Sequence, residues 1–168
     1  MKFTITAALF FLSSITNALP SEIQVRADPS NSPIHLQNGP DQSKSFKCGT
    51  KTYTGHDIYL AAQYGVNLAA IGETRGKAKY PHPFNNDDSK GNLLKFPPEC
   101  PADTNRKEYP LATNGKVYNG SKSNTNTGNE RVVYYEEPGE IGNDGHTLVH
   151  YCGIMTHEGA PTGGFLLC

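Results

Sequence analysis

The spacing of apolar residues changes once along this 168-residue chain, and that change limits the folds open to it. Apolar and small residues recur at helical spacing in one segment only, at Ile58, Ala61, Ala62, Gly65 and Ala69. Thr54, with Asp57 three residues later, resembles a capping box that has Asp in place of Glu. We therefore predict one amphipathic helix that begins near Thr54 and ends before Gly72.

After this helix the pattern changes to short β segments separated by Gly, Asn and Pro. The segments lie near residues 80–85, 108–112, 131–136, 147–156 and 164–167. A polar loop of low complexity, residues 119–130, separates two of them. One helix followed by a run of strands predicts an α+β domain, with the helix packed on an antiparallel sheet.

The beginning of the chain has a different composition from the rest. Residues 1–18 read as a secretory signal peptide, with Lys2, a short apolar stretch and a small-residue cleavage site, and the stretch is too short to span a bilayer. Residues 19–47 hold four prolines and show no period, which predicts a flexible extension or a pro-segment. Residues 48–168 form the predicted domain. We expect a secreted, extracellular monomer without membrane attachment once the signal peptide is removed.

Four cysteines, an even number in a chain expected to be exported, predict two disulfides, with three pairings open. They are Cys48, Cys100, Cys152 and Cys168. A glycosylation sequon begins at Asn119, in the polar loop, and predicts an exposed position there.

The charge balance argues against a protein that holds polyanions through many contacts. Residues 48–168 contain 11 Lys and Arg against 13 Asp and Glu, a net charge of 11 − 13 = −2. Affinity for a nucleic acid backbone would need a basic face, and no basic cluster is present. Any chemistry on RNA must rest on a few focused groups, which favours an enzyme over a passive binder.

Several β-like segments carry polar groups suited to such chemistry. Tyr80, His82, Glu108, Arg131 and His157 supply a phenol, two imidazoles, a carboxylate and a guanidinium. This set suits cleavage of an RNA phosphodiester without a metal, which needs a base, an acid and cations for the phosphoryl charge. Tyr80 and His82 are two residues apart, so in a strand they share a face. Arg131 on an inner strand needs an anionic partner, either Glu108 or a bound phosphate.

Each of these residues has a plainer interpretation when taken alone. A single histidine is usually a surface or hydrogen-bonded residue, and we keep this interpretation for His35, His56, His146 and His150. Two of these, His146 and His150, could share a strand face with Cys152, but a disulfide is the better use of that cysteine. We expect no metal and no cofactor.

Four segments taken together point to a known family: residues 80–86, 108–110, 129–133 and 153–160, the last continuing to Phe165 and Cys168. With them, residues 48–168, which are 121 of the 168 residues, resemble the fungal guanyl-specific ribonucleases of the ribonuclease T-one family. The stretch also resembles their relatives, the sarcin-like ribotoxins.

The resemblance implies six catalytic residues. Glu108 matches the general base that takes the 2′-OH proton, His157 the general acid that protonates the leaving 5′ oxygen, and His82 an electrostatic aid to the base. The others bind or shield the phosphate: Arg131, Tyr80 and Phe165. The implied reaction is metal-free transphosphorylation to a 2′,3′-cyclic phosphate, followed by hydrolysis to a 3′-phosphate.

Guanine recognition is implied for Phe84, Asn85, Asn86, Asp87, Asp88 and Gly163. A single carboxylate can accept the two adjacent donors of guanine, and Asp88 takes that position, one methylene shorter than the usual Glu. Asp87 stands where a second stacking Tyr is common, and losing a stacking partner costs about 1–3 kcal/mol. We expect guanine preference with weakened base binding; an acidic surface loop is the alternative for residues 87–88.

The resemblance also implies the pairings Cys48–Cys168 and Cys100–Cys152, the second being ribotoxin-like. Ribotoxins, however, are strongly basic and carry long Lys-rich loops, whereas the segment from Asp88 to Glu108 is short. A secreted endoribonuclease acting on RNA is favoured. The alternatives are a ribotoxin-like effector that acts on host ribosomes and a noncatalytic ribonuclease-like effector.

Overall fold

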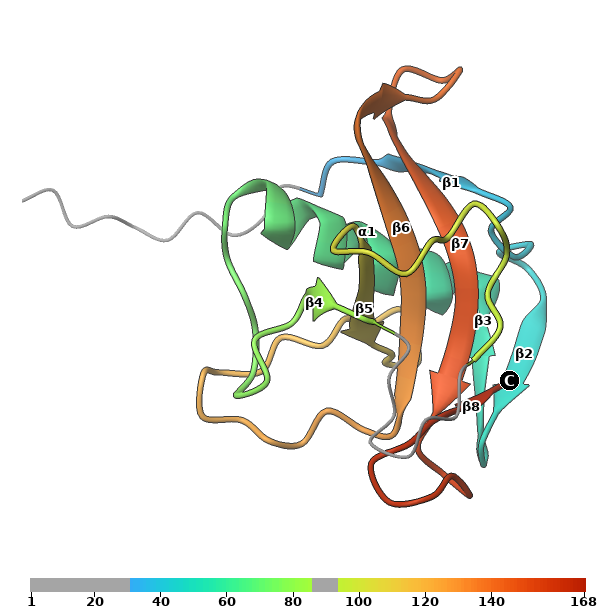
Figure 1. The fold of residues 1–168 in the computed structure, drawn as a ribbon, viewed down its shortest axis with the longest axis vertical. Coiled ribbons are helices and arrows are strands. Elements are labelled where there is room, and N and C mark those ends of the chain that lie inside the picture. The colour runs from blue at the N-terminus through green and yellow to red at the C-terminus, as the bar shows by residue number, and fades with distance from the viewer. Residues whose placement is uncertain (1–30, 86–93) are drawn as a thin grey trace, which may run out of the picture.

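The computed structural model describes residues 31–85 and 94–168, and within these ranges it contains one helix and eight strands (Figure 1). The helix is α1 (Gly55–Ala70). The strands are β1 (Ile34–Gln37), β2 (Ser45–Cys48), β3 (Lys51–Thr54), β4 (His82–Pro83), β5 (Arg106–Pro110), β6 (Glu130–Ile141), β7 (Thr147–Thr156) and β8 (Leu166–Leu167). None of the helices in these ranges is long and apolar enough to cross a membrane.

The strands form one main sheet and one small hairpin. The main sheet has the order β1-β7-β6-β5-β4, with β8 paired to β7, and β2 pairs with β3 alone. All neighbouring strands are antiparallel except β1, which runs parallel to β7. The predicted α+β class, with a helix on a mainly antiparallel sheet, is confirmed.

The helix begins where its cap predicts. The Thr54 hydroxyl accepts from the backbone N–H of Asp57 at 3.0 Å, and the Asp57 carboxylate accepts from the backbone N–H of Thr54 at 2.9 Å, so the capping box is complete. Gly65 faces the sheet, and a Cβ there would collide with the hydroxyl of Tyr134. The small residues of the helical pattern therefore let the helix approach the strands closely.

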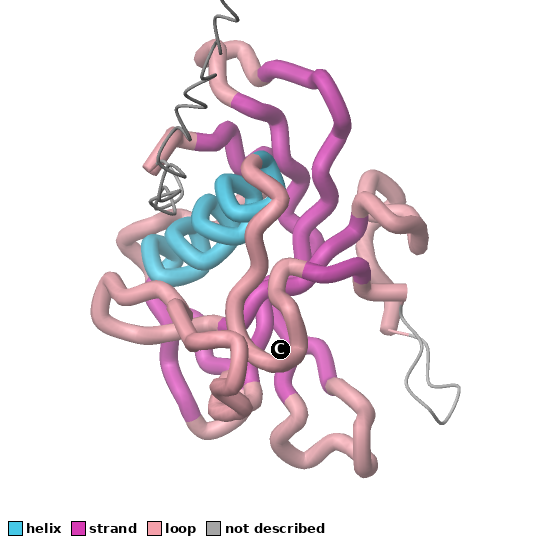
Figure 2. Tube along the Cα trace, turned by 90° about the vertical axis from the view of Figure 1, so that its left-hand side faces the viewer, coloured by secondary structure: helices cyan, strands magenta, loops and turns pink. Residues whose placement is uncertain are grey.

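The sheet has an apolar cluster on each face. The helix lies on one side of the main sheet (Figure 2). On this face, residues of α1 pack with Tyr109, Val132 and Tyr134, all fully buried. The next residue along β6, Val133, belongs to a second cluster on the opposite face, because side chains alternate along a strand. The members of this second cluster are Phe84, Cys100, Val133, Tyr135, Cys152 and Met155, bordered by Leu94, Phe96 and Phe165.

Both disulfides have the pairing that the resemblance implied. Cys48–Cys168 joins the end of β2 to residue 168, with Cα atoms 5.0 Å apart. Cys100–Cys152 joins the loop before β5 to β7, with Cα atoms 5.9 Å apart.

The structure differs from the sequence prediction in the segment before Cys48. The strands Ile34–Gln37 and Ser45–Cys48 lie largely within residues 19–47, for which the sequence predicted a flexible extension or a pro-segment without strands. The four prolines suggested disorder, but Ile34 is only 4% exposed and its strand pairs along β7. Residues 1–30, with the predicted signal peptide, lie outside the described ranges, and removal of any part of this segment stays a prediction.

Candidate active site

The strand register brings the predicted catalytic residues to one face of the sheet. His82 of β4 lies opposite Glu108 of β5, and Pro110 of β5 lies opposite Arg131 of β6. Residues opposite or two apart in a strand share a face, so Glu108 and Arg131 point to the same side, away from the helix. Arg131 in turn lies opposite Met155, and His157 follows two residues later, just past the end of β7.

Glu108 is a buried carboxylate that uses only one of its oxygens. Its residue is 4% exposed, and its Oε1 lies 3.3 Å from Nε2 of His82. Its Oε2 is buried and has no hydrogen-bond partner among the described residues. Burial raises the pKa of Glu108, and the charges of His82 and Arg131 oppose this shift in part. A buried carboxylate with an elevated pKa and an unpaired oxygen is suited to take a proton.

Arg131 brings a buried positive charge without a carboxylate partner among the described residues. Its Nε donates to the Tyr80 hydroxyl at 3.1 Å, and its Nη2 donates to Oγ1 of Thr127 at 2.7 Å. Its Nη1 donates to the carbonyls of Thr127 and Gly128 at 3.3 and 3.0 Å. These neutral acceptors fix the guanidinium in place and leave its charge uncompensated. The first of the two partners expected for Arg131, an ion pair with Glu108, does not form in this part of the chain.

Tyr80 contacts both Arg131 and His82. Its ring stacks on that of His82, with centroids 4.7 Å apart and planes inclined by 27°. Its hydroxyl accepts from Arg131, and a phenol that accepts a hydrogen bond still carries a proton of its own to donate. Burial raises the pKa of Tyr80, so the phenol stays protonated near neutral pH. The predicted face that Tyr80 and His82 share is present as a stacked pair.

His157 is held in one tautomer. Its Nδ1 lies 2.7 Å from the carbonyl of Gly164, which can only accept, so Nδ1 carries a hydrogen and Nε2 remains for proton transfer. The imidazole stacks on Phe165, with centroids 3.7 Å apart and planes inclined by 29°. Burial lowers the pKa of His157, and the Gly164 hydrogen bond opposes that shift. Phe165, predicted as an apolar wall beside the phosphate, lies against the His157 imidazole.

The residues predicted to bind guanine are only partly placed. Phe84 is 8% exposed and packs edge-on against Phe96 and Phe165, with centroids 5.9 and 5.6 Å away. Asn85 is exposed, and Gly163 lies in the exposed turn between His157 and Phe165. Asn86, Asp87 and Asp88 lie outside the described residues, so the predicted carboxylate for guanine is not located.

Arg106 belongs to this neighbourhood, and the sequence reasoning missed it. It is 3% exposed, its Nε donates to the carbonyl of Phe84 at 2.9 Å, and its Nη1 donates to the carbonyl of Cys100 at 3.0 Å. The guanidinium also lies over the rings of Phe84 and Phe96, 5.8 and 5.0 Å from their centroids. It stands two residues before Glu108 in a β segment, and this spacing could have revealed that both share a face.

These features suit an enzyme that acts on a phosphodiester, and comparison with known proteins gives the family. Residues 41–168 match the model of a family described as ribonuclease. The chain belongs to this family.

Curated relatives cover most of this ribonuclease-family chain. It is 29% identical over 123 residues to guanyl-specific ribonuclease C2 of Aspergillus clavatus, covering 73% of the chain and 76% of that protein. It is 29% identical over 128 residues to guanyl-specific ribonuclease T1 of Aspergillus oryzae, covering 76% and 81%. It is 26% identical over 121 residues to extracellular guanyl-specific ribonuclease Fl1 of Gibberella baccata, covering 72% and 92%.

The other four histidines of the described residues each approach a polar side chain. His35 and His146 both approach Asp144, at 2.9 and 3.3 Å. His56 contacts Gln42 at 3.0 Å, and His150 contacts Glu137 at 3.1 Å. The site described above uses none of these four histidines. Asn119 is exposed, and its amide oxygen accepts from Nε of Arg75 at 2.8 Å.

Proposed function

We propose that this protein is a secreted endoribonuclease that cleaves single-stranded RNA, preferentially after guanosine, without a metal. One observation carries the proposal: the unpaired Oε2 of Glu108 lies on β5 and the orientated imidazole of His157 directly follows β7, the two strands on either side of β6, which carries Arg131. The guanidinium of Arg131, which has no carboxylate partner among the described residues, can therefore bind a phosphate between Glu108 as the base and His157 as the acid. The names of the relatives and the predicted signal peptide support the guanine preference and the secretion.

In the first step, Oε2 of Glu108 takes the proton of the ribose 2′-OH, and the 2′ oxygen attacks phosphorus. The bond from phosphorus to the 5′ oxygen breaks, and Nε2 of His157 gives its proton to that oxygen. The products are a 2′,3′-cyclic phosphate and a 5′-hydroxyl. In the second step, water gives a proton to His157 and attacks phosphorus, while Glu108 returns its proton to the 2′ oxygen, leaving a 3′-phosphate.

The other groups act on charge. Arg131 faces the phosphoryl oxygens with a positive charge that no described carboxylate neutralises, and Tyr80 adds its hydroxyl proton. His82, 3.3 Å from Glu108, stabilises the ionised form of the base. Burial moves the pKa of Glu108 up and the pKa of His157 down. The upward shift brings the pKa of Glu108 closer to the pH range in which a general base is efficient, whereas the downward shift makes the His157 imidazolium a stronger acid that is protonated at lower pH.

For the base, we propose that the carboxylate of Asp88 accepts the ring N–H and the exocyclic amine of guanine, with Asn85 and Asn86 reading the other edge. Phe84 and Gly163 border that site. The hydrogen bond and ring contacts of Arg106 hold Phe84 in position, which supports a fixed aromatic neighbour for the base.

The decisive experiment is digestion of a short RNA of defined sequence, with EDTA present, by the wild-type protein and by Glu108→Ala. Cleavage after guanosine that leaves cyclic or 3′-phosphate ends, and that is lost in the variant, is the expected result. Cleavage without base preference would contradict the guanine site. No cleavage of free RNA would contradict the proposed endoribonuclease activity on single-stranded RNA and would favour a noncatalytic effector.

A second candidate function is ribotoxin-like cleavage of ribosomal RNA, which the disulfide Cys100–Cys152 favours. Intact ribosomes incubated with the protein distinguish the two functions. A single defined fragment would support the ribotoxin-like activity, whereas general degradation is expected of a guanyl-preferring ribonuclease.

A further inference from the structure

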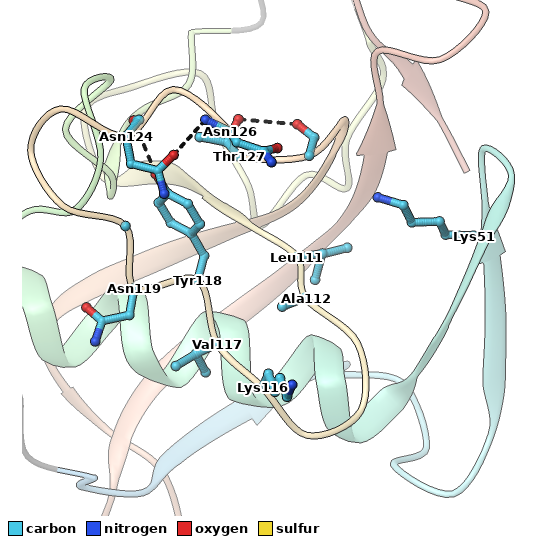
Figure 3. Close-up of a pocket in the computed structure, with 12 residues that line it drawn as sticks. Lys51, Leu111, Ala112, Lys116, Val117, Tyr118, Asn119, Asn124, Asn126 and Thr127 are labelled. Atoms are coloured by element: carbon cyan, nitrogen blue, oxygen red, sulfur yellow. Dashed lines mark hydrogen bonds between the residues drawn. The ribbon is translucent and has the colours of Figure 1, made fainter.

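A cavity of about 470 Å³ with polar and apolar lining lies next to the candidate active site and takes no part in the mechanism above. It is formed by the loop between β5 and β6 and by the start of β3 (Figure 3). The lining residues that matter here are Lys51, Lys116, Tyr118, Asn126, Thr127 and Gly128. Its size falls in the range of ligand-binding pockets.

This cavity shares a wall with the group that is proposed to bind the scissile phosphate. Thr127 and Gly128 line the cavity, and the same two residues offer their carbonyls to Nη1 of Arg131. On the cavity side, a Cβ placed on Gly128 would lie 3.6 Å from Nζ of Lys51. The guanidinium of Arg131 and the ammonium of Lys51 therefore lie on two sides of one glycine.

The shared wall is on the His157 side of Arg131. The backbone N–H of His157 donates to the carbonyl of Asn129 at 3.0 Å, next in sequence to Gly128. Because His157 is proposed to protonate the 5′ oxygen of the departing nucleotide, the downstream RNA leaves the site near this wall. Phe84, the described aromatic residue proposed for the guanine base, directly follows β4, which β5 and β6 separate from β7.

The lining chemistry suits an anion. Lys51 and Lys116 line the cavity together with three asparagines, and none of its lining residues is acidic. The carboxylate of Glu130 lies just behind this wall, with its Oε2 3.8 Å from a Cβ placed on Gly128. Lys51 donates one N–H to Glu130 at 3.1 Å, so its other two N–H groups remain for a ligand. Lys116 is exposed, and no ion pair is formed by it among the described residues.

We propose that this cavity binds the phosphate on the 3′ side of the nucleotide that follows the scissile bond, with Lys51 and Lys116 as its cations. The proposal rests on the proposed ribonuclease function. A phosphate site in this cavity would make the enzyme prefer substrates that extend at least two nucleotides beyond the cleaved guanosine, although the domain has no overall positive charge to attract RNA.

The test compares kcat/KM for three short RNAs: GpU, the 3′-extended GpUpU and the 5′-extended UpGpU. The protein is freed of N-glycans first, because Asn119 also lines the cavity. We expect the wild-type protein to cleave GpUpU at least fivefold more efficiently than GpU, with no such gain for UpGpU. Lys116→Gln and Lys51→Gln should each reduce the ratio between GpUpU and GpU. Each should also lower the dependence of log kcat/KM on log salt concentration for GpUpU by about 0.7.

Lys44→Gln is the matched control, because Lys44 is exposed next to the other end of the β2–β3 hairpin and does not line the cavity. For this variant, the ratio of kcat/KM for GpUpU to kcat/KM for GpU should equal that of the wild-type protein. Lys116→Gln carries the greater weight, since Lys51 also contacts Glu130. An equal gain from 5′ extension, an equal loss in Lys44→Gln, or an unchanged ratio in Lys116→Gln would overturn the proposal. Absence of cleavage of any substrate by the wild-type protein would instead overturn the proposed function itself.

Discussion

Replacing Glu108 with Gln should remove the general base while keeping the shape of the side chain. General-base catalysis contributes about 10²–10⁴-fold to the rate, or about 2.7–5.5 kcal/mol of transition-state stabilisation. The structure favours the lower end of this range, because a second proton acceptor lies close by. Nε2 of His82 is 3.3 Å from the carboxylate, and its side chain is 33% exposed. Without the carboxylate, that imidazole can accept the 2′-OH proton in its neutral form.

The effects of the two residues should therefore be strongly non-additive. Two unit charges 3.3 Å apart attract by about 5 kcal/mol at an effective dielectric constant of 20. Solvent reaches a third of the His82 side chain and screens this attraction, so we expect His82→Gln alone to cost about 1 kcal/mol, roughly fivefold in kcat/KM. Glu108→Gln should cost about 10²-fold, and the double variant about 10⁴-fold, because it lacks both acceptors.

The assay is steady-state cleavage of a GpC dinucleotide, followed by chromatography of the 2′,3′-cyclic product. Thermal unfolding of each variant serves as the control for folding. Because burial raises the pKa of Glu108, its ionised form weakens the native state at neutral pH, and the neutral amide should not lower the unfolding temperature at pH 7. Near-normal turnover by Glu108→Gln would refute its role as base. If the double variant is no slower than Glu108→Gln, His82 does not act as the proton acceptor when the carboxylate is absent.

Three further predictions concern the acid, its wall and a buried support. The base must be ionised and the acid protonated, and burial moves the pKa of Glu108 up from 4.5 and the pKa of His157 down from 6.5. A plot of kcat/KM against pH should therefore be a narrow bell with its maximum between these values. A profile that is flat from about pH 4 to 8 would contradict the assignment of this acid and base. Phe165→Leu removes the ring stacked 3.7 Å from His157 and should lower kcat/KM by about two- to twelvefold, from the 0.5–1.5 kcal/mol of such a contact; an unchanged kcat/KM would show that the wall does not support the acid. Tyr53→Phe removes the hydroxyl that donates to buried Glu130 at 2.9 Å and should lower the free energy of unfolding by about 1.5–3 kcal/mol in urea titrations, whereas a loss below about 0.5 kcal/mol would mean that water replaces the bond.

The helix and the main strands could be predicted because their signals are local. Thr54 and Asp57 lie within one turn and cap each other, so the sequence alone locates the start of the helix. The strand β1 could not be predicted in the same way. Its pairing joins Ile34 to Thr147, more than a hundred residues apart, and nothing near Ile34 indicates that partner.

The same distinction holds within the site. The residues proposed for catalysis could be named from the family resemblance, and the register of β4, β5 and β6 places three of the strands that carry them side by side. The full set of partners of Arg131 could not be inferred, because two of its acceptors are backbone carbonyls of the loop at residues 127–128. Every residue has a backbone carbonyl, so the sequence does not show which carbonyls will contact Arg131. Only the folded conformation of the loop brings these two to the guanidinium.

The parallel strand β1 also protects the sheet from other copies of the protein. Without it, the stretch from Thr147 to His150 of β7 would present unpaired backbone N–H and carbonyl groups along a sheet edge, the surface on which foreign strands add. The contact of His35 with Asp144, 2.9 Å apart, holds the strand to the hairpin between β6 and β7. A protease that trimmed the chain beyond Gln37 would therefore yield a protein inclined to aggregate through that edge, and any processing that preserves a soluble enzyme must cut before Ile34.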